Sequence, residues 1–116
     1  MKQVQVVNTT RGSTLGTRVG LADRWWLRLR GLLGRPALAP GEGMLLTPCS
    51  GVHMVGMTYP IDVAFLDRAG AVVALYHGLA PRARSGWHPD ARDALELPEG
   101  TLRSSGTLPG DLLVRA

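Results

Sequence analysis

The chain has few of the residues that support a disulfide-stabilised or aromatic-rich protein. Its 116 residues include one cysteine, which excludes an internal disulfide bridge and removes any need for an oxidising compartment. Aromatic residues make up only 5%, so the core must consist mainly of Leu, Val, Ala and Met. No apolar run approaches the roughly 18 residues of a membrane span, and the N-terminus has no signal-peptide pattern. We therefore expect a cytoplasmic protein without a membrane segment.

Lysine is almost absent, because Lys2 is the only one and the other basic residues are all arginine. Residues 1–35 carry seven basic side chains and one acidic side chain, Asp23, whereas residues 36–116 carry six basic and eight acidic ones. An arginine-rich N-terminal third favours contact with phosphate or with an acidic partner. A solvated basic surface is the simpler interpretation, because a dedicated nucleic-acid domain normally carries a denser basic patch.

The remaining composition is that of a globular protein, with 45% hydrophobic and 19% charged residues. A chain of this length forms one domain by the usual size relationship, so we expect a single domain over residues 1–116. A domain of this size buries roughly two-thirds of its unfolded surface and needs no disulfide or metal to hold its core.

The N-terminal part of the chain predicts two strands followed by a helix. Alternation in "KQVQVV" predicts a strand with Val4 and Val6 turned inward, and "GTRVGLA" predicts a second strand after a polar turn. Over residues 22–33 the period changes to that of an amphipathic helix. Its apolar face comprises Trp25, Trp26, Leu29, Leu32 and Leu33, and its basic face comprises Arg24, Arg28 and Arg35.

From residue 43 onward the sequence pattern is typical of β-strands. Strands are predicted for "GMLLTPC", "VHMVGM", "IDVAFLD", "AVVALYH", "DALELP" and "GDLLVRA". The "DRAG" turn predicts a hairpin, residues 79–92 with Trp87 predict a long surface loop, and residues 99–106 predict a short helical turn. We therefore predict an α+β fold in one compact β-rich domain, with a mainly antiparallel curled sheet or small barrel.

Cys49 and His53 are candidates for nucleophilic catalysis, with Cys49 as nucleophile and His53 as base. In an extended strand their Cα atoms would lie about 13 Å apart, so only a tight turn at Ser50–Gly51 would bring them together. A small buried cysteine at a strand end is the simpler interpretation. Together with Met54 and Met57 these residues are also soft donors that suit copper(I). Neither the paired cysteines nor the paired histidines of a zinc site occur, so we predict no metal site and no cofactor.

Asp62 is the most informative polar residue, because its neighbours in "PIDVAFLD" are apolar on both sides. Its strand partners on the same face are Ala64 and Leu66, so we expect its carboxylate to be buried. A buried carboxylate must be paired or hydrogen-bonded. The expected donors are N–H groups of a turn near Pro60, an arginine from the helix, or His53.

Taken together, "RLRGLLGR", "GEGMLLTPC", "VHMVGMTYPIDVAFLD" and "ALELPEGT" followed by "GD" resemble the Domain of Unknown Function 192 family of bacteria and archaea. The resemblance implies a compact β-rich domain with one flanking helix, and it implies no enzyme activity. His53 falls where many relatives carry tryptophan, which does not favour a ligand or a base. The positions that match the family pattern are Gly31, Leu32, Gly43, Met44, Met54, Pro60, Asp62, Phe65, Asp67, Glu96, Gly100, Gly110 and Asp111.

The leading functional prediction is a non-catalytic module that binds a small molecule or a protein partner. The ligand-binding candidates are His53, Met57, Asp62, Arg35 and Glu96. The alternative is a hydrolase or transferase that uses Asp62 with His53 or Cys49, and it requires these side chains to converge in one pocket. A third alternative is weak nucleic-acid binding through Arg24, Arg28 and Arg35.

Overall fold

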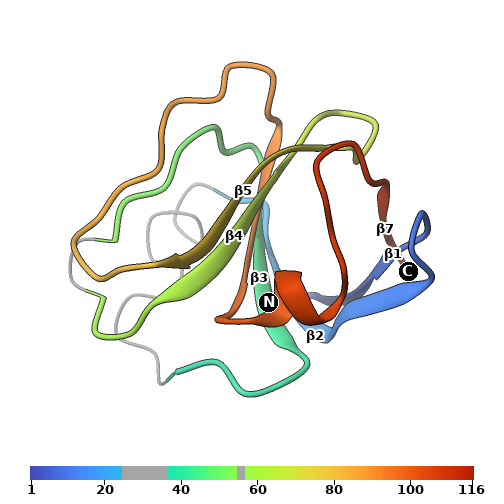
Figure 1. Ribbon diagram of the computed structural model, residues 1–116, viewed down its shortest axis with the longest axis horizontal. Helices are drawn as coiled ribbons and strands as arrows, with labels where there is room; N and C mark the ends of the chain where they lie inside the picture. Colours follow the sequence, from blue (N-terminus) through green and yellow to red (C-terminus); the bar gives the residue numbers. More distant parts are fainter. Residues whose placement is uncertain (25–36, 55–56) are drawn as a thin grey trace.

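The structure is a computed structural model, and it describes residues 1–24, 37–54 and 57–116. Within these ranges the chain forms seven strands and one short helix (Figure 1). The elements are β1 (Gln3–Asn8), β2 (Ser13–Ala22), β3 (Glu42–Leu46), β4 (Ile61–Leu66), β5 (Val72–Leu79), β6 (Asp93–Pro98), α2 (Thr101–Ser104) and β7 (Leu113–Arg115). Among the described residues, none forms a helix with the length and apolar character needed to cross a membrane.

All seven strands form one sheet in the order β5-β4-β6-β3-β2-β1-β7. Every neighbouring pair is antiparallel except β2 and β3, which run parallel. The sheet curls into a half-barrel whose two edge strands meet at one end, where Ala71 and Leu112 form a β-bridge. Backbone bonds from Val72 N to the Asp111 carbonyl (2.9 Å) and from Leu113 N to the Gly70 carbonyl (2.9 Å) complete this junction.

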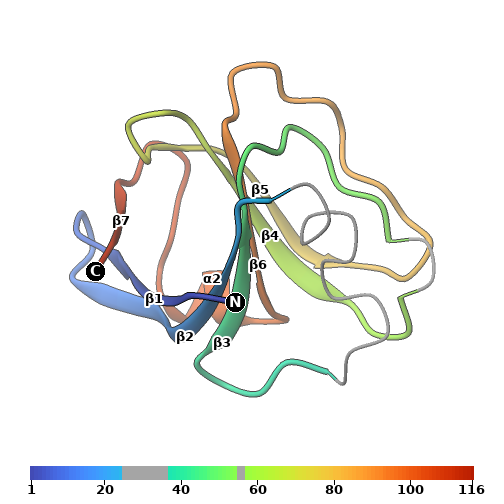
Figure 2. The same ribbon diagram turned by 180° about the vertical axis from the view of Figure 1, so that it is seen from behind.

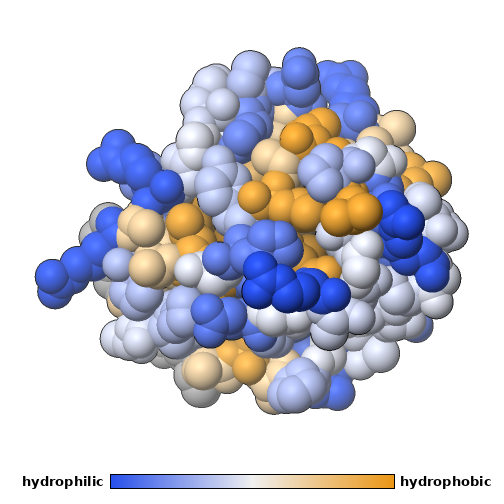
Figure 3. Space-filling view, viewed as in Figure 1, coloured by the Kyte–Doolittle hydropathy of each residue, from blue (hydrophilic) through white to orange (hydrophobic). Residues whose placement is uncertain are grey.

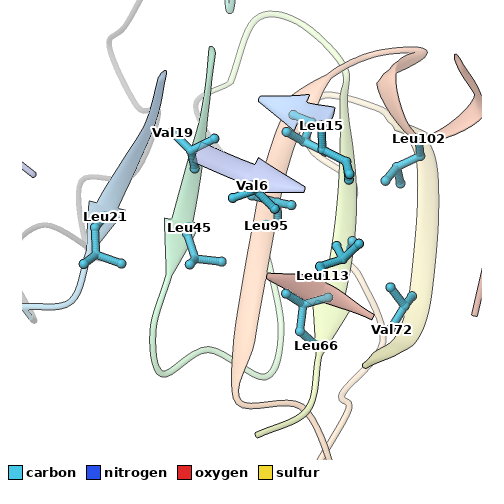
Figure 4. Packing of buried hydrophobic residues seen from close by; sticks show 12 residues of the cluster. Val6, Leu15, Val19, Leu21, Leu45, Leu66, Val72, Leu95, Leu102 and Leu113 are labelled. Carbon is cyan, nitrogen blue, oxygen red and sulfur yellow. The ribbon is translucent and has the colours of Figure 1, made fainter. Parts of the chain in front are cut away.

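The concave side of the sheet holds an inner cluster of apolar side chains (Figure 4). Alternation along each strand places every second residue on this side. Figure 4 shows Val6 of β1 and Leu113 of β7 lying over side chains of β3, β4 and β6. The buried members are Val6, Leu15, Val19, Leu21, Leu45, Ala64, Leu66, Val72, Leu95, Leu97, Leu102 and Leu113. Full burial of one such leucine contributes about 1.5–3 kcal/mol.

The opposite side of the sheet holds an outer cluster, which the segments around residues 47–54 and 80–92 cover (Figures 1 and 2). These two segments pair with each other, because Met54 N donates to the Ala83 carbonyl (2.8 Å) and Ser85 N donates to the Val52 carbonyl (2.9 Å). The buried members of the outer cluster are Ala22, Met44, Leu46, Val52, Met54, Ile61, Val63, Phe65, Ala91 and Ala94. The sheet is therefore buried on both faces in its centre.

A buried polar network fastens the segment between α2 and β7 to the end of β1. The amide of Asn8 donates to Thr107 Oγ1 (3.1 Å) and to Asp111 Oδ2 (3.0 Å). Arg11 forms a bidentate ion pair with Asp111, in which Nε donates to Oδ2 (3.0 Å) and a terminal nitrogen donates to Oδ1 (3.2 Å). These bonds and the Leu108 N–H lower the pKa of Asp111 to about 2.

Most strand predictions are confirmed, and three details differ. The described residues of "VHMVGM" do not form a strand of the sheet, and among them His53 forms a single β-bridge with Arg84. Ala22, expected to begin a helix, is the last residue of β2, and the rest of the predicted helix lies largely outside the described residues. The helical turn expected over residues 99–106 is confirmed as α2, which is shorter. The β-rich curled sheet is confirmed as a half-barrel.

Candidate ligand-binding site

Asp62 lies at the start of β4 with a side chain that is fully buried on the concave side of the sheet. Its carboxylate accepts three backbone hydrogen bonds. Oδ1 accepts from Gly78 N (2.8 Å), and Oδ2 accepts from Gly100 N (3.0 Å) and Leu102 N (3.0 Å). The expectation of a buried, hydrogen-bonded carboxylate is correct, but the expected donors were wrong. The donors come from β5 and α2, which are distant in sequence from Pro60 and from the arginine-rich segment.

The bonds from Asp62 position the short helix α2 over one end of the half-barrel. Gly100 is the N-cap residue of α2 and has a positive φ of 93°. As a glycine it has no side chain with which to cap the helix. Asp62 of β4 supplies this cap instead, because its carboxylate accepts from N–H groups that the start of a helix leaves free. Leu102 is thereby held in the inner cluster, fully buried. Asp62 has a structural role that uses both of its oxygens.

Glu96 lies on the opposite face of the sheet from Asp62. Its register partners Met44 and Val63 both belong to the outer cluster, whereas the register partner of Asp62 is Leu97 of the inner cluster. The Glu96 side chain is 6% exposed. Burial raises the pKa of Glu96 to about 7.

The remaining candidates near Asp62 in the sequence are Cys49, His53, Met54 and Met57. Cys49 is partly buried and its thiol donates to the Gly51 carbonyl (3.2 Å). His53 is exposed beside Arg84, and Met57 packs against the outer cluster. Met54 is 1% exposed, as expected for a core side chain. Within the described ranges, no three His, Cys, Asp or Glu side chains are grouped so that they could hold a metal ion.

The arginine face predicted for the helix is described only at Arg24, which is exposed. Arg28 and Arg35 lie outside the described residues. Of the five ligand-binding candidates, the structure thus places Asp62 on the concave side, and it places Glu96, Met57 and His53 on the convex side or on its covering segments. These residues do not meet Asp62 in one pocket.

A cavity opens at the end of the half-barrel away from α2, and we call it the barrel mouth. The strand β4 runs from Ile61 to Leu66, so α2, which is bonded to Asp62, covers the start of this strand and the mouth lies at its end. The cavity has a volume of about 260 Å³. The residues that line it are Val6, Leu45, Leu66, Arg68, Ala69, Gly70, Asp93, Leu113, Val114 and Arg115.

The lining of the barrel mouth combines an apolar floor with three charged groups. Val6, Leu45, Leu66 and Leu113 belong to the buried inner cluster and form the floor. Arg68 and Arg115 are exposed at the rim. Figure 3 shows hydrophobic surface exposed beside hydrophilic residues on the face of the molecule seen in Figure 1.

Asp93 is the unusual member of the lining. It is the first residue of β6, and its register partner is Leu66 of the inner cluster, so its side chain belongs to the concave side. Its Oδ1 is buried and has no hydrogen-bond partner within the described part of the chain. A buried acceptor without a donor costs about 1–3 kcal/mol, and a donor that reached this oxygen would recover that energy.

The sequence predicted none of these mouth residues as a site. The residues come from five strands and one turn that only the curl of the sheet brings together. One signal was available, because alternation in "DALELP" places Asp93 on the same face as Leu95 and Leu97. An inward-facing carboxylate at the start of a core strand indicates an unusual environment.

The fold and the cavity define the class of the protein: a small β-rich half-barrel domain with an opening at one end. The chain belongs to the DUF192 family, described as an uncharacterised ACR, whose model matches residues 6–114. This confirms the resemblance seen in the sequence motifs. No curated protein is significantly similar to the chain.

Two crystal structures show the same fold. A protein of unknown function from Novosphingobium aromaticivorans has a TM-score of 0.81 and 23% identity, with 97% of this chain and 83% of that chain covered. A protein from Sinorhizobium meliloti, described as a "putative transcription regulator", has a TM-score of 0.80 and 26% identity, with 97% of this chain and 92% of that chain covered.

Proposed function

We propose that this protein is a non-catalytic domain that binds a small molecule in the barrel mouth. The observation that carries the proposal is Asp93 Oδ1, which has no hydrogen-bond donor among the described residues and belongs to a residue that lines a cavity with an apolar floor and two arginines. Ligand sites commonly combine an apolar lining with a few polar groups that fix orientation. The volume of about 260 Å³ is a little below the range of roughly 300 Å³ and above that holds drug-sized ligands.

The composition of the lining favours binding over catalysis. Acid–base or nucleophilic chemistry needs a nucleophile and a base in hydrogen-bond reach of each other. The mouth has one carboxylate and two arginines, and its lining includes no histidine, cysteine, serine or lysine. The enzyme alternative would use Asp62 with His53 or Cys49, but Asp62 already accepts three backbone hydrogen bonds.

A second ligand site around Glu96 and Met57 remains a proposal of its own. Its support is the buried Glu96 side chain, whose pKa is raised to about 7 by burial. A ligand that donates a hydrogen bond there would favour the charged form of Glu96. In an NMR titration with a ligand, shifts of the amide signals of Met44 and Val63, rather than of residues at the barrel mouth, would indicate this second site.

Nucleic-acid binding has less support. It rests on the excess of basic residues over residues 1–35 and on the similarity to the Sinorhizobium meliloti protein, whose description names transcription regulation. If the chain used this basic segment to bind DNA, its affinity would fall steeply with salt, and Arg24→Glu would weaken it. A fluorescence-anisotropy titration of duplex DNA at two salt concentrations distinguishes this function from the barrel-mouth proposal.

The test of the barrel-mouth proposal is a ¹H–¹⁵N NMR titration with three small probes: leucine, 4-methylpentanoate and 3-methylbutylamine. We expect at least one probe to shift the amide signals of Leu66, Gly70 and Leu113. Ala69→Trp, which introduces a large side chain at the exposed rim, should abolish the shifts. Val73→Trp is the matched control, because Val73 is exposed on β5 but does not line the cavity. Shifts that persist in Ala69→Trp, or no shifts with any probe, would overturn the proposal.

A further inference from the structure

We infer that the ligand of the barrel mouth is a free α-amino acid with an apolar side chain, held by both of its charged groups. This inference rests on the proposed binding function and names its ligand class. In this arrangement the ligand carboxylate contacts Arg68 and Arg115, its ammonium group contacts Asp93, and its side chain lies on the apolar floor. Each of these partners lines the same cavity.

The charges of the lining favour a ligand that carries both signs. A ligand with only a carboxylate would satisfy the arginines but leave Asp93 without a donor and add a second negative charge beside it. A ligand with only an ammonium group would satisfy Asp93 but would be repelled by Arg68 and Arg115. A zwitterion meets both requirements at once, since carboxylates pair well with guanidinium groups and ammonium groups donate to carboxylates.

The guanidinium groups and the carboxylate of the lining lie at different depths, and this difference sets the orientation of the ligand. Arg68 is in the exposed turn after β4, and Arg115 is an exposed residue of β7. Asp93 is only partly exposed, and its Oδ1 is buried. The ligand carboxylate therefore stays near solvent at the rim, and its ammonium group reaches further in.

The size and floor of the cavity indicate the kind of side chain. A cavity of roughly 150 Å³ is enough for a benzene ring. The barrel mouth, at about 260 Å³, leaves room for an amino-acid head group beside a side chain of that size. The floor of Val6, Leu45, Leu66 and Leu113 offers no polar partner, so leucine, isoleucine, methionine and phenylalanine fit its chemistry better than serine or glutamate.

The decisive experiment compares leucine with its two truncated analogues on the unmodified protein. 4-Methylpentanoate is leucine without the amino group, and 3-methylbutylamine is leucine without the carboxylate. We expect leucine to bind about tenfold or more tightly than either analogue by isothermal titration calorimetry, because each analogue loses one charge-assisted contact. We also expect L-leucine to bind more tightly than D-leucine, since three contact points define a handed site.

Two substitutions assign the contacts. Asp93→Asn should weaken leucine binding about tenfold and leave 4-methylpentanoate binding unchanged or stronger. Arg115→Gln should weaken leucine and 4-methylpentanoate alike without weakening 3-methylbutylamine. The matched controls are Asp90→Asn and Arg103→Gln, which change exposed residues outside the mouth and should alter none of these affinities.

The outcomes separate the ligand class from the binding function. If 4-methylpentanoate binds as tightly as leucine and Asp93→Asn changes neither affinity, the amino-acid inference is wrong while the binding function stands. If none of the three probes shifts the mouth amides, both are wrong. The comparison of leucine with its analogues needs no variant, so it decides the inference even if Asp93→Asn does not fold.

Discussion

The carboxylate of Asp62 accepts a hydrogen bond of 3.0 Å from the backbone N–H of Leu102, a residue 40 positions later in the chain. This bond joins strand β4 to the helix that covers one end of the half-barrel. The same carboxylate bonds to Gly78 in β5 and to Gly100 before the helix. One side chain thus connects three segments that share no local sequence signal.

Substitution of Asp62 should therefore lower the stability of the fold. Asp62→Ala leaves three N–H groups without an acceptor, and we expect the free energy of unfolding to fall by about 3–5 kcal/mol. Asp62→Asn keeps one carbonyl oxygen, and we expect a loss of about 1–3 kcal/mol. Urea denaturation followed by circular dichroism measures both values.

The matched control for Asp62 is Asp90→Asn, because Asp90 is an exposed aspartate in the loop before β6. A surface change of this kind should lie within about 0.5 kcal/mol of the unmodified protein. A loss in Asp62→Asn no larger than that of Asp90→Asn would mean that the three hydrogen bonds do not stabilise the fold.

Local patterns in the sequence predicted most of the fold. Alternation predicted β1 with Val6 inward, the hairpin of β4 and β5 with its "DRAG" turn, and the strand "DALELP". The strand prediction for "VHMVGM" was wrong for a physical reason. The segment pairs with the loop at Arg84 rather than with the sheet, and an apolar segment that covers a sheet face has much the same composition as a strand.

The candidate site was less predictable, because it depends on contacts between distant segments. The burial of Asp62 followed from its apolar neighbours, but its donors Gly78 and Leu102 are backbone groups, which carry no residue signature. The barrel mouth depends on how far the sheet curls, and therefore on which strands meet. Separate strand predictions cannot fix that geometry, so Asp93 and Arg115 were not recognised as neighbours.

Glu96 should make stability depend on pH around neutrality. Burial raises its pKa to about 7 in the folded protein, above the ordinary value of 4.5. Between these values the folded state binds more protons than the unfolded state, so stability is highest below about pH 4.5 for this group and falls as pH rises through 7. The whole shift corresponds to about 3 kcal/mol. Glu96→Gln should remove this dependence.

The measurement is the urea midpoint of the unmodified protein and of Glu96→Gln at pH 5 and pH 8. We expect Glu96→Gln to be the more stable of the two at pH 8, with a smaller difference at pH 5. Glu99→Gln is the control, because Glu99 is exposed three residues later. If Glu96→Gln destabilises the protein more at pH 8 than at pH 5, the carboxylate has a favourable partner and the prediction is wrong.

Asp111 should impose the opposite pH dependence in acid. The hydrogen bonds from Arg11, Asn8 and Leu108 lower its pKa to about 2, below the ordinary value of 3.8. A lowered pKa gives stability that is present above about pH 4 and is lost as pH falls toward 2. Asp111→Asn should lower the urea midpoint at pH 7, and the difference from the unmodified protein should shrink toward pH 2. A difference that stays constant over this range would contradict the ionic role of Asp111.

The close approach of β3 and β6 depends on the absence of a side chain at Gly43. A Cβ atom at this position would lie 2.8 Å from the Glu96 carbonyl oxygen and 3.0 Å from Leu97 Cδ2. A backbone oxygen cannot move away without disturbing the strand, so Gly43→Ala should destabilise the fold by about 1–3 kcal/mol. Gly51→Ala is the matched control, since its nearest neighbour would lie 3.6 Å away in ordinary contact. Equal thermal stability of the two variants would show that the sheet can widen at Gly43, and the strand spacing beside Glu96 would then not be fixed by this glycine.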